Sequence, residues 1–283
     1  MHFKPSHLLV LSALLLEACA GVPAYEGLPP AAKDQIASTE VVLPIKQSEI
    51  YVYVPPSNVA AATGGGLLPA LIDVAVDTVR TDKAEAAVKP LRNALIDYSF
   101  DASMQVQIKS ALNQVAWLHV DDVRLSKDVS GQTLDRTISG AKESAVMLAS
   151  SDYQLSNDGD VLTVSMSAAL YPNTDSLRAL RTGRAKSSPS DLANAIYHNT
   201  LTFSYRLPAA TADRDTNIAL WSKDNGAPMR KALDASSAKL AWLLSQDLQS
   251  TMTGTPVPAG DANGMVGRMD NGTLKYTANS LWQ

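Results

Sequence analysis

Two stretches of the chain alternate between apolar and polar side chains. Leucine, valine, methionine and alanine occupy every second position of residues 162–170, with serine, threonine or alanine between them. Residues 200–207 repeat the pattern, with leucine, phenylalanine and tyrosine set against threonine, serine and arginine. A period of two is typical of strands that bury one face. We therefore predict two strands, each with one buried and one wetter face.

A turn signal precedes the first of these strands. Residues 145–156 and 160–171 flank the sequence Asn-Asp-Gly at 157–159. Asp-Gly is favoured in tight hairpin turns, which need residues that tolerate positive φ. We predict a hairpin of 145–156 and 160–171, with the strand at 200–207 as its third member.

Helical spacing begins at Leu67. The apolar positions that share one side of this helix are Leu68, Leu71, Ile72, Ala75, Val76 and Val79. Pro90 should end or kink the helix near Val88, because proline lacks an N–H and disfavours helix at the residue before it. A short helix at 90–97 would follow.

Other elements follow from apolar spacing and from residues that begin or end helices. Asp101 is a candidate N-cap for a helix over 101–115, and Pro228 should begin a long helix that ends at Gly254. The remaining expected elements are strands at 41–44, 49–55 and 118–127 and a short helix at 138–144.

This order of elements predicts an α+β domain of two layers. We expect a mainly antiparallel sheet of about four to five strands, with the helices packed on one face. The other face is polar in two strands, so it is either solvated or a partner surface. Residues 173–191 read as a mobile connection, and residues 255–283 as an irregular tail with a small peripheral hairpin around Asn271 and Gly272.

The N-terminus has the form of a signal peptide. Residues 8–16 carry no charge and follow Lys4, the only fixed positive charge of the segment. Nine uncharged residues are too few to span a bilayer but suit the core of a signal peptide. We predict a signal peptide at 1–18.

The residues that end this segment resemble a bacterial lipobox. Leu16, Glu17 and Ala18 precede Cys19, the only cysteine of the chain, and Glu17 departs from the usual pattern. The resemblance implies acylation of Cys19, hence a membrane as partner, and Ala20 in place of aspartate favours the outer membrane. The alternative is an ordinary secretory signal peptide. We predict a flexible tether at 19–38, a single periplasmic α+β domain at 39–254 and the tail at 255–283.

The composition argues against nucleic-acid binding. The chain has a net charge of −4, and only 6% of its residues are aromatic. Nucleic-acid binding needs a basic field and stacking surfaces, so we expect no nucleic-acid partner.

No catalytic, cofactor-binding or metal-ligating set stands out. Asp121 and Asp122 lie near His119 in the sequence, but successive residues of a strand point to opposite faces. Zinc needs three or four clustered ligands, so we expect His119 and His198 to be structural. Ser139 and Lys142 have Ser-x-x-Lys spacing but lack the companion motifs. The glycine run at 64–66 lacks the lysine of a phosphate-binding loop. We therefore predict no cofactor and no enzymatic activity.

One charged cluster is a candidate contact with an anionic surface. It comprises Arg178, Arg181, Arg184 and Lys186. Basic side chains near an anionic membrane each contribute on the order of 1 kcal/mol to binding. The alternative is an ordinary solvated loop.

The hairpin sequence carries a second resemblance. Residues 151–156 and 161–170 resemble a group of periplasmic α/β domains: the N-terminal domain of the Tol-system protein TolB, curli-secretion lipoproteins and lipoprotein activators of peptidoglycan synthases. This resemblance implies a non-enzymatic envelope protein. We expect an outer-membrane lipoprotein that binds an envelope protein as an assembly, scaffolding or regulatory factor. The alternatives are an envelope-polymer hydrolase, and a carrier of an apolar ligand between the sheet and the helix at 67–79.

Overall fold

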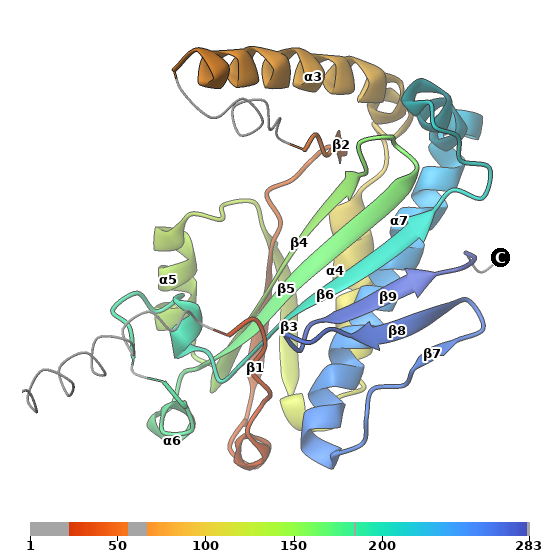
Figure 1. The fold of residues 1–283 in the computed structure, drawn as a ribbon. Coiled ribbons are helices and arrows are strands. Elements are labelled where there is room, and N and C mark those ends of the chain that lie inside the picture. The colour runs from red at the N-terminus through yellow and green to blue at the C-terminus, as the bar shows by residue number, and fades with distance from the viewer. Residues whose placement is uncertain (1–22, 56–66, 184, 282–283) are drawn as a thin grey trace, which may run out of the picture.

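The computed structural model describes residues 23–55, 67–183 and 185–281, with side chains from residue 79 onward in the second range. One sheet runs through the described chain, with strand order β3-β1-β4-β5-β6-β9-β8-β7, and β2 also pairs with β4 (Figure 1). Its strands are β1 (Thr39–Pro44), β2 (Tyr51–Val52), β3 (Val120–Ser126), β4 (Ala145–Leu155), β5 (Val161–Pro172), β6 (Tyr197–Arg206), β7 (Gly260–Asp261), β8 (Gly264–Arg268) and β9 (Leu274–Ala278). The helices are α3 (Leu67–Ala94), α4 (Phe100–Leu112), α5 (Gly131–Gly140), α6 (Asp175–Arg178) and α7 (Arg214–Thr253). Short 3-10 turns occur at Pro30–Ala32, Ala116–Leu118 and Leu192–Asn194.

The predicted α+β class is confirmed, but the prediction of a mainly antiparallel sheet of four to five strands is wrong. The sheet has nine strands and is mixed. β1 pairs in parallel with both β3 and β4, and β9 pairs in parallel with β6. Parallel neighbours are joined by long crossovers rather than by tight turns. No local turn signal therefore marks these pairings in the sequence.

The predicted hairpin and third strand are confirmed. β4 and β5 pair without a shift along their whole length, and β6 pairs antiparallel with β5. Gly159 adopts a φ of +66° in the turn, which glycine reaches without steric cost. The hydroxyl of Ser156 accepts from the backbone N–H groups of Asp160 and Val161, each at 3.1 Å, and this closes the turn.

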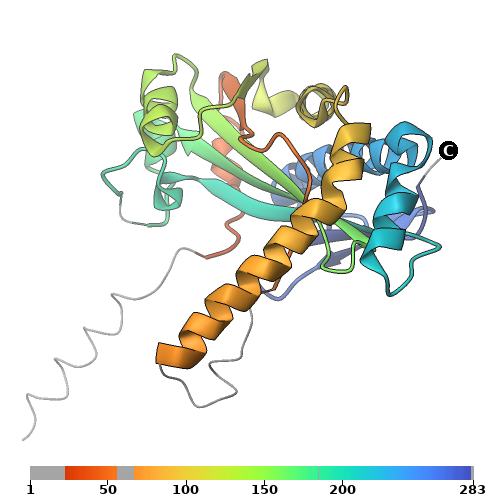
Figure 2. The same ribbon diagram turned by 90° about the horizontal axis from the view of Figure 1, so that it is seen from above.

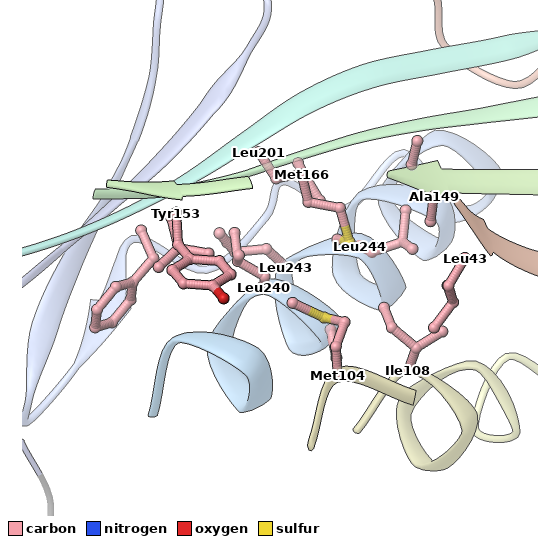
Figure 3. Packing of buried hydrophobic residues seen from close by; sticks show 14 of the residues in the cluster. Leu43, Met104, Ile108, Ala149, Tyr153, Met166, Leu201, Leu240, Leu243 and Leu244 are labelled. Carbon is pink, nitrogen blue, oxygen red and sulfur yellow. The ribbon is translucent and has the colours of Figure 1, made fainter. Parts of the chain in front are cut away.

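Two helices, α4 and α7, cover one face of the sheet, which we call the inner face (Figure 1). α3 crosses the upper end of the sheet in Figure 1 and packs against α7, as Figure 2 shows from above. Alternate residues of the strands are buried there against the helices. In Figure 3, residues of the sheet point toward those of α4 and α7; the labelled side chains include Leu43, Met166 and Leu201 from strands and Met104, Ile108, Leu240 and Leu244 from helices.

The opposite, outer face is not bare, so the expectation of helices on one face alone is wrong. α5 packs on this face through Ile138 and Leu134, against a second apolar cluster. Its sheet members are Val42, Val146, Leu148, Ala169 and Tyr171. The helix expected at 138–144 lies earlier in the chain, because Ser130 caps its start by accepting from the N–H of Thr133 at 3.3 Å.

α3 continues through Pro90 to Ala94. Of the predicted end or kink near Val88, the end is therefore wrong, and so is the separate helix at 90–97. Ala84, Val88 and Leu91 are buried along one stripe that extends on both sides of Pro90. This packing offsets the loss of a single helical hydrogen bond. The side chains of residues 67–78, including most of the predicted apolar stripe, lie outside the described part.

The other helices agree in position but not in every boundary. The N-cap of α4 is Ser99, which comes before the predicted cap, Asp101. α7 begins at Arg214 and is interrupted at residues 223–226, where Asp224, Asn225 and Gly226 have positive φ. The part after the interruption is the helix predicted from Pro228, and it ends at Gly254 in the left-handed conformation.

The expectation of a flexible tether at 19–38 is wrong for the part that the structure describes. Leu28, Ala32 and Ile36 are buried in the main core. The backbone of Glu26 pairs with that of His198, at 2.9 and 3.1 Å. These apolar residues recur every fourth position, a signal that the nearby prolines and glycine obscure. From Pro23 onward the segment is part of the folded body, whereas Cys19 and the predicted signal peptide lie outside the described residues.

The C-terminal hairpin forms as predicted but is not peripheral. β8 and β9 pair antiparallel, and β9 extends the central sheet through its parallel pairing with β6. Tyr276 on β9 stacks on Phe203 of β6, with ring centroids 5.9 Å apart. The sheet therefore continues beyond the boundary expected at residue 254.

A buried carboxylate links the first described segment and β8 to α7. Asp247 is fully buried and accepts from Tyr197 Oη at 3.0 Å, Asn199 Nδ2 at 2.7 Å and Arg268 Nη2 at 2.6 Å. The Arg268 guanidinium also lies 4.9 Å from the ring centre of Tyr25. Burial and the neighbouring Asp247 raise the pKa of Tyr197 well above its usual value, so this phenol stays protonated and donates. The set of Asp247, Arg268, Tyr197 and Asn199 is called the Asp247 cluster below.

No helix among the described residues combines the length and the apolar character that a membrane crossing requires.

Candidate functional site: a groove on the outer face of the sheet

A groove of about 970 Å³ lies on the outer face of the sheet, on the side away from α4 and α7. Strands β4, β5 and β6 form its floor, and the segment that joins β1 to β2 forms one wall. Residues from α5 and from the segment before β6 line it as well. This is the sheet face that the alternation in the sequence marks as polar.

Hydroxyl side chains cover the centre of the floor. Ser150 of β4 is in register with Ser167 of β5, which is in register with Thr200 of β6. Neighbouring strands lie about 4.8 Å apart, so the three hydroxyls form a row across the sheet. Each hydroxyl can both donate and accept. The floor therefore offers hydrogen bonds to a ligand of either polarity.

The end of the groove nearest α5 is apolar. Leu134 of α5, Leu148 of β4 and Tyr171 of β5 line it, together with Leu192. Leu192 is 44% exposed, so its side chain is accessible from the groove. This end can take up an apolar side chain of a ligand.

The opposite rim carries charge. Lys46, Glu49, Tyr51 and Asp152 lie there. Partial burial between the groove walls raises the pKa of the Asp152 carboxyl, although solvent still reaches its side chain. Burial, with the negative charge of Asp152, also raises the pKa of Tyr51. Glu49 is turned toward α3, since its carboxylate lies 3.3 Å from Nε of Arg92.

Gln47 fixes the position of this rim. Its Nε2 donates to the carbonyl oxygen of Tyr153 at 2.7 Å, and its Oε1 accepts from the N–H of Tyr153 at 2.9 Å. The side-chain amide thus replaces a strand partner on β4 between the positions that β1 and β2 occupy. The rim is held by the sheet, so the groove is present before a ligand arrives.

His198 lies at the end of the groove where the described chain begins. It is 4% exposed, and its Nε2 is 2.5 Å from the carbonyl oxygen of Pro23. A carbonyl oxygen only accepts, so Nε2 carries the hydrogen. Nδ1 is buried without a partner among the described residues. A buried polar atom without a partner is costly.

The structure brings three members of the predicted basic cluster together, and Arg184 lies outside the described part. Arg178, Arg181 and Lys186 line a separate pocket of about 200 Å³. The described residues around them pack against the body, whereas we expected a mobile connection at 173–191. Leu177 is fully buried, and the Tyr171 hydroxyl donates to the carbonyl of Ser190 at 2.9 Å. Cys19, the predicted lipidation site, also lies outside the described residues.

The residues tested for catalysis do not come together. Ser139 donates to the carbonyl oxygen of Asp135 at 2.7 Å within α5. His119 is exposed, in a left-handed turn just before β3. In the described ranges, no group of three histidine, cysteine or carboxylate side chains could hold a metal ion.

Comparisons with known proteins add little. No family model matches the chain, and no curated protein matches it either. Among solved structures, the chain is similar to a PelC dodecamer from Paraburkholderia phytofirmans at 10% sequence identity. The similarity covers 81% of this chain and 96% of that chain, with a TM-score of 0.28. A likeness this weak carries no argument about fold or function.

Proposed function

We propose that this protein is a lipoprotein held at the outer membrane by acylated Cys19, with a periplasmic body that binds an envelope protein in the groove. In this role it acts as an assembly, scaffolding or regulatory factor and not as an enzyme. The anchoring rests on the apolar run at 8–16 and the lipobox-like residues before Cys19. The binding role rests on the groove.

The observation that carries the binding role is the combination of surfaces within one groove. An apolar end at Leu134 and Leu148, a hydroxyl floor at Ser167 and a charged rim at Asp152 lie along the same depression. Protein-binding sites commonly join an apolar centre to polar surroundings that fix orientation. A peptide segment with one apolar side chain and several polar groups would match these surfaces.

Asp152 is the feature that favours the alternative of an envelope-polymer hydrolase. A carboxyl group with a raised pKa in a groove is what a general acid requires. Glycoside hydrolysis commonly uses two carboxylates, however, and the other carboxylate that lines the groove, Glu49, is ion-paired with Arg92. We therefore retain binding as the proposal. The carrier alternative concerns the helix at 67–79, where most side chains are not described.

The anchor is tested by labelling cells with radioactive palmitate. The wild-type chain is expected to incorporate the label and to fractionate with outer membranes. Cys19→Ser is expected to lose the label and to leave the membrane fraction after salt and carbonate washes, because no other cysteine exists for attachment. A matched control is Ser12→Ala, which leaves Cys19 in place. Labelling of Cys19→Ser, or its absence from the wild type, would contradict the anchor.

The groove is tested by site-specific photo-crosslinking in intact envelopes. A photoreactive amino acid at Ser167, on the groove floor, is expected to trap a defined protein adduct. The matched control position is Val106, which is 65% exposed on α4, on the other side of the sheet. Adducts formed equally from both positions, or none from Ser167, would contradict a partner in the groove.

A further inference from the structure

A small basic pocket lies beyond the groove, at the end of β5. Its volume is about 200 Å³, and it is bordered by the last turn of α5 and by the segment between β5 and β6. Arg178, Arg181 and Lys186 supply its cationic side chains. The proposed partner site does not use this pocket.

A single buried side chain organises the pocket. Asn194 is 8% exposed, and its Oδ1 accepts from Arg181 Nη1 and from the Lys186 N–H, both at 2.9 Å. Its Nδ2 donates to the carbonyl oxygens of Lys186 at 3.1 Å and Ser188 at 2.7 Å. Asn194 thereby holds the arginine side chain and the backbone of the lysine together. The cations are fixed by the fold and not gathered by chance on a loose loop.

The positive charge of the pocket is only partly compensated. Arg178 is ion-paired with Asp175 at 3.0 Å. Within the described residues, neither Arg181 nor Lys186 has a carboxylate within ion-pair distance, and Arg181 donates only to the neutral oxygens of Arg178 and Asn194. The chain as a whole carries a net charge of −4. A local excess of positive charge on an acidic protein is suited to a specific anion.

The same region holds the start of the described chain. The Thr182 hydroxyl donates to Glu26 Oε1 at 2.6 Å, and the Pro23 carbonyl contacts His198. Only four Cα–Cα steps separate Cys19 from Pro23, so the two Cα atoms are at most about 15 Å apart. α6 lies at one end of the molecule and α3 at the other (Figure 1). An acyl chain on Cys19 would therefore bring the α6 end close to the bilayer.

We infer that the pocket of Arg178, Arg181 and Lys186 binds the phosphate group of an anionic membrane lipid and orients the body with α6 toward the bilayer. The inference rests on the proposed anchor, which supplies the nearby membrane. Two arginines and a lysine offer several charged donors, and a phosphate group presents oxygens that accept them. The small volume suits one headgroup phosphate better than a folded partner.

The test uses the mature chain from residue 19 with Cys19→Ser, so that no acyl chain contributes. It is expected to bind vesicles that contain phosphatidylglycerol and to bind vesicles of phosphatidylcholine alone much more weakly. The added pair Arg181→Gln and Lys186→Gln should weaken binding to the anionic vesicles by roughly 10- to 30-fold, given about 1 kcal/mol for each charge. Lys186→Gln alone, at an exposed side chain, should weaken it about fivefold.

The control pair is Lys89→Gln with Lys231→Gln, which removes the same charge from exposed positions on α3 and α7. It should leave vesicle binding within about twofold of the parent, because these helices lie away from the pocket. Equal losses from both pairs, or no preference of the parent for anionic vesicles, would overturn the inference. Because this assay involves no acylation, its failure leaves the palmitate result intact, and a failure of palmitate labelling would show separately that the anchor is wrong.

Discussion

Replacing Trp221 by alanine is expected to lower the free energy of unfolding by about 3–5 kcal/mol. Trp221 is fully buried in the first part of α7 and packs edge-on against Tyr205, with ring centroids 6.1 Å apart. Its indole Nε1 donates to the carbonyl oxygen of Gly159 at 2.8 Å, in the turn between β4 and β5. The substitution removes a large apolar side chain and leaves that carbonyl without its partner. Urea denaturation followed by circular dichroism measures the change.

Trp221→Phe separates the two contributions. Phenylalanine keeps most of the buried apolar surface but cannot donate, so a smaller loss of about 1–2 kcal/mol is expected. Nearby contacts support the role of α7 in holding this turn: Asn217 Nδ2 donates to the carbonyl of Asp158 at 2.8 Å. A loss below about 1 kcal/mol for Trp221→Ala would show that the turn and α7 are not coupled in this way.

Arg268→Met, on the C-terminal hairpin, is expected to lower the free energy of unfolding by about 3–5 kcal/mol. Arg268 supplies the only positive charge within ion-pair distance of the buried Asp247 among the described residues. Without it the carboxylate keeps its hydrogen bonds from Tyr197 and Asn199 but is an uncompensated charge in the core. Denaturant unfolding at neutral pH measures this loss.

A second substitution tests the cause. Asp247→Asn, added to Arg268→Met, removes the uncompensated charge and is expected to restore part of the lost stability. Lys275→Met is the matched control, since Lys275 is exposed on the neighbouring strand β9 and should change stability by less than about 0.5 kcal/mol. If Arg268→Met behaves like Lys275→Met, the ion pair does not stabilise the fold.

Local patterns predicted those parts of the fold whose stability is itself local. The alternation at 162–170 and the Asp-Gly turn gave β4, β5 and their register, because one face of this hairpin is buried and the turn has one favoured geometry. The helix after Pro228 was predicted in the same way. The parallel pairing of β1 with β4 and that of β9 with β6 were not predicted, because each joins segments that are distant in the sequence.

The predicted boundaries of α3 and of the tether were wrong because tertiary packing outweighs local sequence preference there. Proline at position 90 is unfavourable in an isolated helix, but buried Val88 and Leu91 on either side of it keep α3 continuous. The prolines of residues 23–30 suggested a tether, yet Leu28 is buried in the core. In both cases packing against distant residues outweighs the local preference.

The groove could be anticipated only in part. The polar face of the strands pointed to a solvated or partner surface, and Ser167 and Thr200 indeed line the floor. Its walls come from the segment around Gln47, from α5 and from the residues near Leu192, which no spacing in the sequence connects. The basic pocket was visible as a run of cations, but Asn194, which organises it, carries no sequence signal of its own.

The contact between Tyr25 and Gly272 joins segments that are synthesised far apart in time. Gly272, at a φ of +87°, lies so close to Tyr25 that a Cβ atom there would come within 2.6 Å of the tyrosine side chain. Tyr25 therefore makes its contacts with Arg268 and Gly272 only once β8 and β9 are in place. Because synthesis proceeds from the N-terminus, Tyr25 is made long before β8 and β9, and a chain that stopped before residue 264 would lack its contacts with Arg268 and Gly272.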